Sequence, residues 1–160
     1  MPSVLFVCTG NQYRSPIAAA FFSRQLQEHG RRGKWRIGSA GTWTVPKQPL
    51  PADAVRDAIS IGVDIQGHLT KTVNESMLKV YDLILAMEKG QKEAMCVEFP
   101  FAQDRIHLLS EMQEGIPYDV PDPLQSPGEH YLILREMCDL IQRGYPRITM
   151  LAEHLSRRQS

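Results

Sequence analysis

The chain has 160 residues, and its 18 Lys and Arg residues balance its 18 Asp and Glu residues. This neutral composition gives no sign of nucleic-acid or anionic-membrane binding, and the length predicts a single domain over residues 1–160. The N-terminus lacks a signal-peptide pattern, no apolar run is long enough to span a bilayer, and three cysteines are too few for a disulfide framework, so we expect a cytoplasmic protein with free thiols.

The first predicted strand is the apolar run at positions 4–7, and Ser15-Pro16 has the form of an N-cap followed by proline at the first helical position. The loop between them carries Cys8 and Arg14 in a Cys-x5-Arg pattern. Loop N–H groups and the positive end of the helix favour a tetrahedral oxyanion, and the same field stabilises a thiolate. The guanidinium of Arg14 can bind two phosphate oxygens at once. The pattern therefore predicts a nucleophile beneath a bound phosphoryl group.

A single cysteine at a strand end is more often a small buried residue than a catalyst. The combination of Cys8 with Gly10-Asn11 and Arg14-Ser15-Pro16, close to the N-terminus, reverses that expectation. These residues resemble the loop of the low-molecular-weight protein tyrosine phosphatases, which reads Cys-x-Gly-Asn-x-Cys-Arg-Ser-Pro. Tyr13 departs from it, because the family usually has a second cysteine there. By this resemblance, the residues of the phosphate-binding loop are Thr9, Gly10, Asn11, Gln12, Tyr13 and Ser15.

After the loop, apolar positions at helical spacing predict a helix that ends between Gly30 and Gly33, and alternation at 35–39 predicts a second strand. A strand–helix–strand unit of this length has a right-handed crossover, so both strand ends point to one edge of the sheet. The resemblance implies that Trp43, just beyond the second strand, forms a wall of the phosphotyrosine pocket. Without the resemblance, Trp43 reads as a surface residue tucked against its own loop.

His68 follows a predicted helix around positions 55–59 that Gly62 ends. The resemblance implies that His68 supports the loop through a hydrogen-bond network with Asn11, Ser15 and Ser39. Asparagine also suits the loop physically, because it tolerates a left-handed backbone better than most residues. No second histidine or cysteine stands at metal-ligand spacing, so we expect no metal and no cofactor.

Farther along, Thr72 to Glu75 has the form of a capping box before a short helix. The third and fourth strands are predicted at 83–87 and 106–109, with a helix from Glu88 to Cys96 between them. A second capping box at 126–129 predicts the start of the last helix, which we expect to continue through Pro146 with a kink. Cys96 and Cys138 fall on helices and read as structural thiols. The predicted fold is a three-layer α/β architecture, with a four-stranded parallel sheet of order 2-1-3-4 and helices on both faces.

A long polar loop joins the fourth strand to the last helix, and Pro121 and Pro123 hold Asp122 stiffly within it. An Asp-Pro pair alone predicts only a turn. The resemblance implies that Asp122 is the general acid, whereas Asp119 has no following proline. Leu124-Gln125 stands where two aromatic residues are common in the family, so we expect the outer pocket wall to differ.

The resemblance implies a protein-tyrosine phosphatase in which Cys8 forms a phosphocysteine, Arg14 stabilises the phosphoryl oxygens and Asp122 protonates the leaving group. Its expected substrate is a phosphotyrosine-containing protein, and a tyrosine kinase is one candidate. A protein-arginine phosphatase is the alternative that is hardest to exclude, because that activity also occurs on the scaffold of the family and Gln12 borders the substrate. Three other functions fit the residues less well. An arsenate reductase would need further reactive cysteines, and a phosphocysteine carrier of sugar transport has no use for Arg14 with Asp122. A noncatalytic phosphate-binding module needs neither the nucleophile Cys8 nor the acid Asp122.

Overall fold

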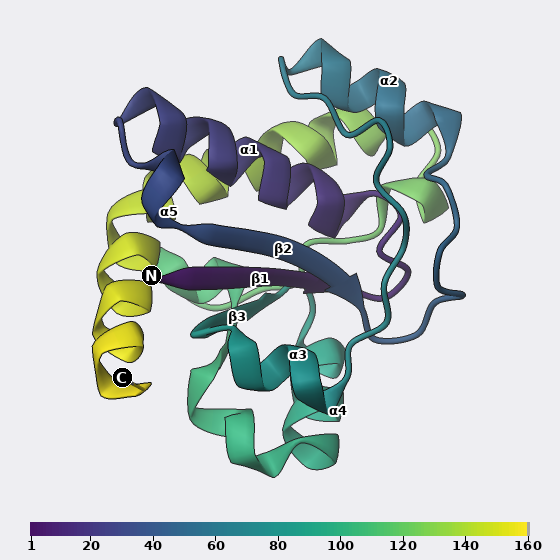
Figure 1. Cartoon of the computed structure of the whole chain (residues 1–160). Helices are drawn as coiled ribbons and strands as arrows, with labels where there is room; N and C mark the ends of the chain where they lie inside the picture. Colours follow the sequence, from purple (N-terminus) through teal and green to yellow (C-terminus); the bar gives the residue numbers. More distant parts are fainter. Residues whose placement is uncertain (160) are drawn as a thin grey trace.

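The computed structural model describes residues 1–159 and contains a four-stranded parallel sheet with the strand order β2-β1-β3-β4 (Figure 1). The predicted strand order and direction are therefore confirmed. The regular elements are β1 (Ser3–Cys8), α1 (Arg14–Glu28), β2 (Arg36–Gly41), α2 (Ala52–Ser60), α3 (Glu75–Val80), β3 (Leu83–Ala86), α4 (Lys89–Glu98), β4 (Ile106–Leu108) and α5 (His130–Gln159).

Helices cover both faces of the sheet, as predicted (Figure 1). Successive side chains of a strand point to opposite faces, so Val4 and Phe6 of β1 pack with α1, α2 and α5, whereas Leu5 and Val7 pack with α3 and α4. Every residue of β1 is buried. The strand that carries the phosphate-binding loop is thus held by protein on both faces.

The register of the sheet brings the carboxyl ends of the strands to one edge. Cys8 lies opposite Gly41 of β2, and Val7 lies opposite Ala86 of β3. The segments that follow these strands therefore start side by side. In open parallel sheets, ligands bind at this edge.

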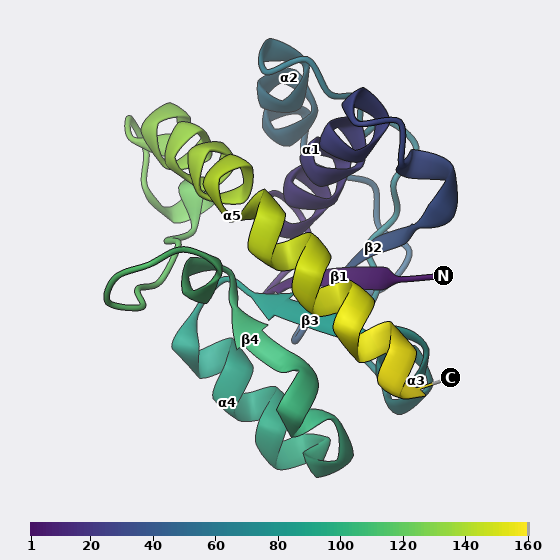
Figure 2. The ribbon, with the colours of Figure 1, turned by 90° about the vertical axis from the view of Figure 1, so that its left-hand side faces the viewer.

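The last helix, α5, continues through Pro146 as a single helix, as predicted. Its first part runs beside α1, and its last part turns along the side of the sheet (Figures 1 and 2). Proline removes one backbone hydrogen bond and crowds the preceding turn, which accounts for a change of direction there.

Three predicted helix starts are displaced. Helix α3 is capped by Asn74, whose Oδ1 accepts from Met77 N at 2.8 Å, rather than by Thr72. Helix α1 already includes Ser15, because its N-cap is Tyr13 and the Ser15 hydroxyl is used by the loop. Helix α5 begins at His130, after a turn at 127–129. The cap of α3 is a side chain of the predicted capping segment, whereas Tyr13 at the start of α1 makes no side-chain cap hydrogen bond.

Candidate active site

The thiol of Cys8 lies at the end of β1, inside a loop whose backbone turns around it. Its Sγ accepts a hydrogen bond from Asn11 N at 3.3 Å and lies 3.0 Å from Ser15 Oγ. Asn11 has φ of 54°, in the left-handed region that asparagine tolerates. Two polar hydrogens can therefore point at the sulfur.

The side chain of Asn11 holds the loop in place with four hydrogen bonds. Its Nδ2 donates to Ser15 Oγ at 2.8 Å and to Ser39 Oγ at 3.0 Å. Its Oδ1 accepts from Lys71 N at 2.9 Å and lies 3.1 Å from His68 Nε2. The four residues predicted to form this network lie together, and the backbone of Lys71 is an additional partner.

The Oδ1 atom of Asn11 can only accept, so the imidazole of His68 carries a hydrogen on Nε2. Burial and the nearby Lys71 ammonium lower the pKa of His68 below its ordinary value. His68 is thus kept neutral while it supports the loop.

Arg14 is almost fully buried and is fastened at one guanidinium nitrogen. Its Nη1 donates to Glu88 Oε2 and to Val120 O, both at 2.7 Å. Glu88 was missed as a site residue by the sequence analysis, although its position two residues after β3 places it at the edge where the loop lies. Charge-assisted bonds of this kind fix the guanidinium in one orientation.

A cavity of about 600 Å³ opens beside this loop. Gly10, Gln12 and Arg14 line it from one side, and Asp122 and Ser126 line it from the other. The predicted guanidinium clamp and the predicted acid therefore face the same space. Oδ1 of Asp122 accepts from Leu124 N at 3.0 Å, which orients the carboxyl group.

Asp119 has a different partner from Asp122. Its Oδ1 accepts from Lys89 N at 2.8 Å, at the first residue of α4. Asp119 also lines a neighbouring hollow of about 440 Å³, together with Trp43 and Glu88.

Trp43 is 85% exposed and lies beside the cavity that Arg14 and Asp122 line, rather than in its wall. Its backbone N donates to Thr9 O at 3.0 Å, which ties its segment to the loop. The indole is thus available at the rim, where it could stack on a bound ring.

The other two thiols lie on helices, as predicted. Cys96 is on α4, and Cys138 is on α5, where burial raises its pKa to about 12. At neutral pH, Cys138 stays protonated and unreactive.

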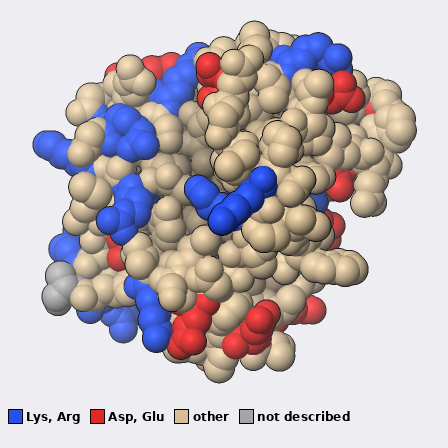
Figure 3. All heavy atoms as spheres, turned by 45° about the vertical axis from the view of Figure 1, so that its right-hand side comes forward, with Lys and Arg blue, Asp and Glu red and all other residues tan. Residues whose placement is uncertain are grey.

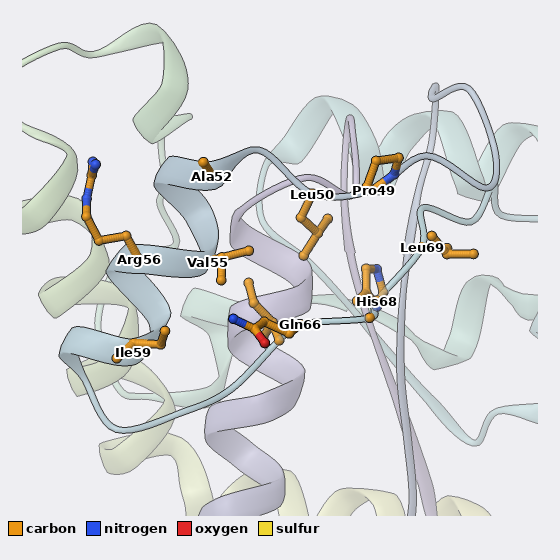
Figure 4. Close-up of a pocket in the computed structure, with 11 residues that line it drawn as sticks. Pro49, Leu50, Ala52, Val55, Arg56, Ile59, Gln66, His68 and Leu69 are labelled. Atoms are coloured by element: carbon orange, nitrogen blue, oxygen red, sulfur yellow. The ribbon is translucent and has the colours of Figure 1, made fainter.

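An apolar hollow of about 480 Å³ lies between α2 and the segment that ends at His68 (Figure 4). Leu50, Val55 and Ile65 line it, but Arg14 and Asp122 do not. It is distinct from the cavity that Arg14 and Asp122 line.

Charged side chains of both signs appear on the face seen in Figure 3, with basic groups on its left, at its centre and at its upper right, and acidic groups at its top, right and bottom. Neither sign covers that face. Within residues 1–159, no helix is long and apolar enough to cross a membrane.

A parallel α/β sheet with a thiol, a buried guanidinium and inward N–H groups after its first strand defines a phosphate-handling protein of the cysteine-dependent class. The family model "Low molecular weight phosphotyrosine protein phosphatase" matches residues 3–160. The chain belongs to this family, and it is therefore a cysteine-dependent phosphatase.

Relatives with known names agree with this assignment. The low molecular weight protein-tyrosine-phosphatase Etp of Escherichia coli K12 is 32% identical over 81% of this chain and 82% of its own length. The low molecular weight protein tyrosine phosphatase of T. tengcongensis is 33% identical, with a TM-score of 0.83 over 92% of this chain and 99% of the other. A mutant of YwlE from Bacillus subtilis is 26% identical, with a TM-score of 0.84 over 93% and 99% of the two chains. The Bacillus subtilis protein-arginine-phosphatase is 29% identical over 88% of this chain and 91% of its own length.

Proposed function

We propose that this protein hydrolyses phosphotyrosine in proteins, with Cys8 as the nucleophile. The thiolate attacks phosphorus, a sulfur–phosphorus bond forms, and the bond to the phenol oxygen breaks. Arg14 and the loop N–H groups stabilise the equatorial oxygens, while Asp122 gives its proton to the departing oxygen. Water then attacks phosphorus, Asp122 takes a proton from it, and the sulfur leaves as thiolate.

One observation carries this proposal: Arg14 and Asp122 line one cavity at the mouth of the loop that surrounds the Cys8 sulfur. A binding module needs neither a thiol nor a carboxyl group at such a place. Ser15 Oγ, 3.0 Å from the sulfur, can donate to the thiolate when it leaves. Proton donation matters because phenol has a pKa near 10, so phenolate is a poor leaving group at neutral pH.

A protein-arginine phosphatase is the second candidate. Relatives from Bacillus subtilis and Geobacillus stearothermophilus carry that name, each with 29% identity to this chain. Gln12 lines the catalytic cavity, where its amide can contact the group that bears the phosphoryl. The exposed indole of Trp43 instead favours a phenyl ring.

The proposed substrate is a phosphotyrosine-containing protein, with a tyrosine kinase as one candidate partner. A cytoplasmic location is supported by the three free cysteines. The proposed unit is a single phosphatase domain over residues 1–160.

The test compares phosphate release from an aryl phosphate, a phosphotyrosine peptide and phosphoarginine, with the native protein and with Cys8→Ser and Arg14→Ala. We expect the aryl phosphate and phosphotyrosine to be hydrolysed by the native protein only, with Cys8→Ser still binding inorganic phosphate. Preferred hydrolysis of phosphoarginine would select the second candidate. Near-native turnover by either variant would remove the proposed roles.

A further inference from the structure

A partly buried chain of hydrogen bonds links the phosphate-binding loop to the start of α5. The hydroxyl of Tyr13 donates to Asp57 Oδ2 at 2.8 Å, and His130 Nδ1 lies 3.0 Å from the same oxygen. A carboxylate oxygen accepts, so His130 donates to it through Nδ1. One carboxylate oxygen on α2 thus joins two segments that lie far apart in the sequence.

Tyr13 directly precedes Arg14 and is 2% exposed. Burial, and to a smaller extent the hydrogen bond to Asp57, raises the pKa of the Tyr13 hydroxyl far above its ordinary value. The hydroxyl therefore remains a donor. Its ring fills the position of the second loop cysteine that is usual in the family, but its polar atom points away from the catalytic cavity toward α2.

His130 is the first residue of α5 and directly follows the segment 121–129, which contains Asp122. The residue before this acid segment is Val120, whose carbonyl accepts from Arg14 Nη1 at 2.7 Å and whose N donates to Met87 O at 2.9 Å. Both ends of the acid segment are therefore fastened to consecutive residues of the loop: Val120 directly by Arg14, and His130 by Tyr13 through Asp57.

Space remains beneath the acid segment for it to shift. A hollow of about 300 Å³ is lined by Tyr13, Asp57 and His130 on one side and by Pro123 and Leu124 on the other. Pro123 and Leu124 directly follow Asp122, so movement into this hollow would carry the acid away from the substrate. The Asp57 side chain is only 9% exposed, so water competes weakly for its bonds.

We propose that Tyr13, Asp57 and His130 are positioning residues that hold Asp122 at the phosphoryl group, with Tyr13 tying the acid segment to the loop. This inference rests on the proposed function, because it acts through the acid role of Asp122. A purely structural role would stabilise α2 and affect every substrate alike. A positioning role affects those substrates whose leaving group needs a proton.

The experiment measures kcat/KM for phenyl phosphate and 4-nitrophenyl phosphate, together with inhibition by inorganic phosphate. The variants are Tyr13→Phe and His130→Ala, and Asp53→Asn is the control, since its carboxylate lines the same hollow but is exposed and pairs with Arg56. We expect Tyr13→Phe and His130→Ala to lose about tenfold on phenyl phosphate and less than about twofold on nitrophenyl phosphate, because small misplacements of a catalytic group are costly. Phosphate inhibition should be unchanged, and Asp53→Asn should behave as native protein.

The double variant Tyr13→Phe with Asp122→Asn separates the two ideas. If the linkage acts through Asp122, adding Tyr13→Phe to Asp122→Asn costs nothing further on phenyl phosphate. Equal losses on both substrates, weaker phosphate inhibition, or full additivity in the double variant would overturn the proposal while leaving the phosphatase function intact. Failure of the proposed function would instead show as activity that survives Cys8→Ser. Because His130 is partly exposed, His130→Ala supplies the test if Tyr13→Phe does not fold.

Discussion

Gly41 lies opposite Cys8 in the sheet, where the loop backbone passes close to β2. A methyl group added here would lie 2.5 Å from Thr9 O and 3.1 Å from Asn11 N. Ordinary contact begins at 3.4 Å, so the Thr9 carbonyl would have to move by 0.9 Å. Asn11 N is the donor to the Cys8 sulfur, and the displacement therefore reaches the nucleophile.

We expect Gly41→Ala to lower kcat/KM about 100-fold, the cost of a misplacement of roughly 1 Å in a catalytic site. Overpacking should also reduce the free energy of unfolding by about 1–3 kcal/mol. The assay is hydrolysis of 4-nitrophenyl phosphate and inhibition by inorganic phosphate at a temperature below the melting transition of each variant.

Gly33→Ala is the matched control, because a methyl group at Gly33 meets nothing within 4 Å and the residue lies between α1 and β2. It should retain native activity. If Gly41→Ala kept kcat/KM and phosphate inhibition within about twofold of native, the close packing of β2 against the loop would not matter for catalysis.

Three further predictions concern single residues. Asp122→Asn should slow phenyl phosphate far more than 4-nitrophenyl phosphate, by up to about 100-fold; equal losses in kcat/KM would reassign the acid, with Asp119 next. Because the pKa of His68 is lowered in the fold, its contribution to stability is complete above the unfolded value of about 6.5 and is lost as pH falls through the lower folded value. Denaturant midpoints should thus fall less between about pH 8 and about pH 5 in His68→Gln than in native protein, and identical slopes would contradict this. Peroxide should inactivate the protein with little recovery on adding dithiothreitol, and bound phosphate should protect against this inactivation. After the same treatment, Tyr13→Cys should regain a larger fraction of its own activity. A reducible disulfide from Cys8 to Cys96 or Cys138 in native protein would refute this.

The sheet could be predicted from the sequence because its signals are local. The apolar runs at 4–7 and 83–87 are too short for helices, and the right-handed crossover rule then fixes how the strands follow one another. The Cys8–Arg14 loop could also be predicted, because its residues are close together in the chain and their chemistry suits phosphate binding.

The partners of the loop could not be predicted in the same way. Arg14 pairs with Glu88, 74 residues away, and Tyr13 reaches His130 through Asp57. No spacing rule connects such positions. The packing of α2 and α5 brings Asp57 and His130 to Tyr13, and the pairing of β3 with β1 brings Glu88 to Arg14. Of these partners, only Glu88 could have been found from the sequence, because it lies just beyond the end of a parallel strand.

The most direct measurement is to trap the covalent intermediate. Asp122→Asn, which should slow both formation and hydrolysis of the phosphoenzyme, is mixed with 4-nitrophenyl phosphate, quenched, digested and analysed by mass spectrometry. The mechanism predicts one phosphoryl group on the peptide that contains Cys8, and none when Cys8→Ala is added. A phosphoryl group on another residue, or a burst of nitrophenol with unmodified Cys8, would contradict the central claim that the Cys8 sulfur attacks phosphorus.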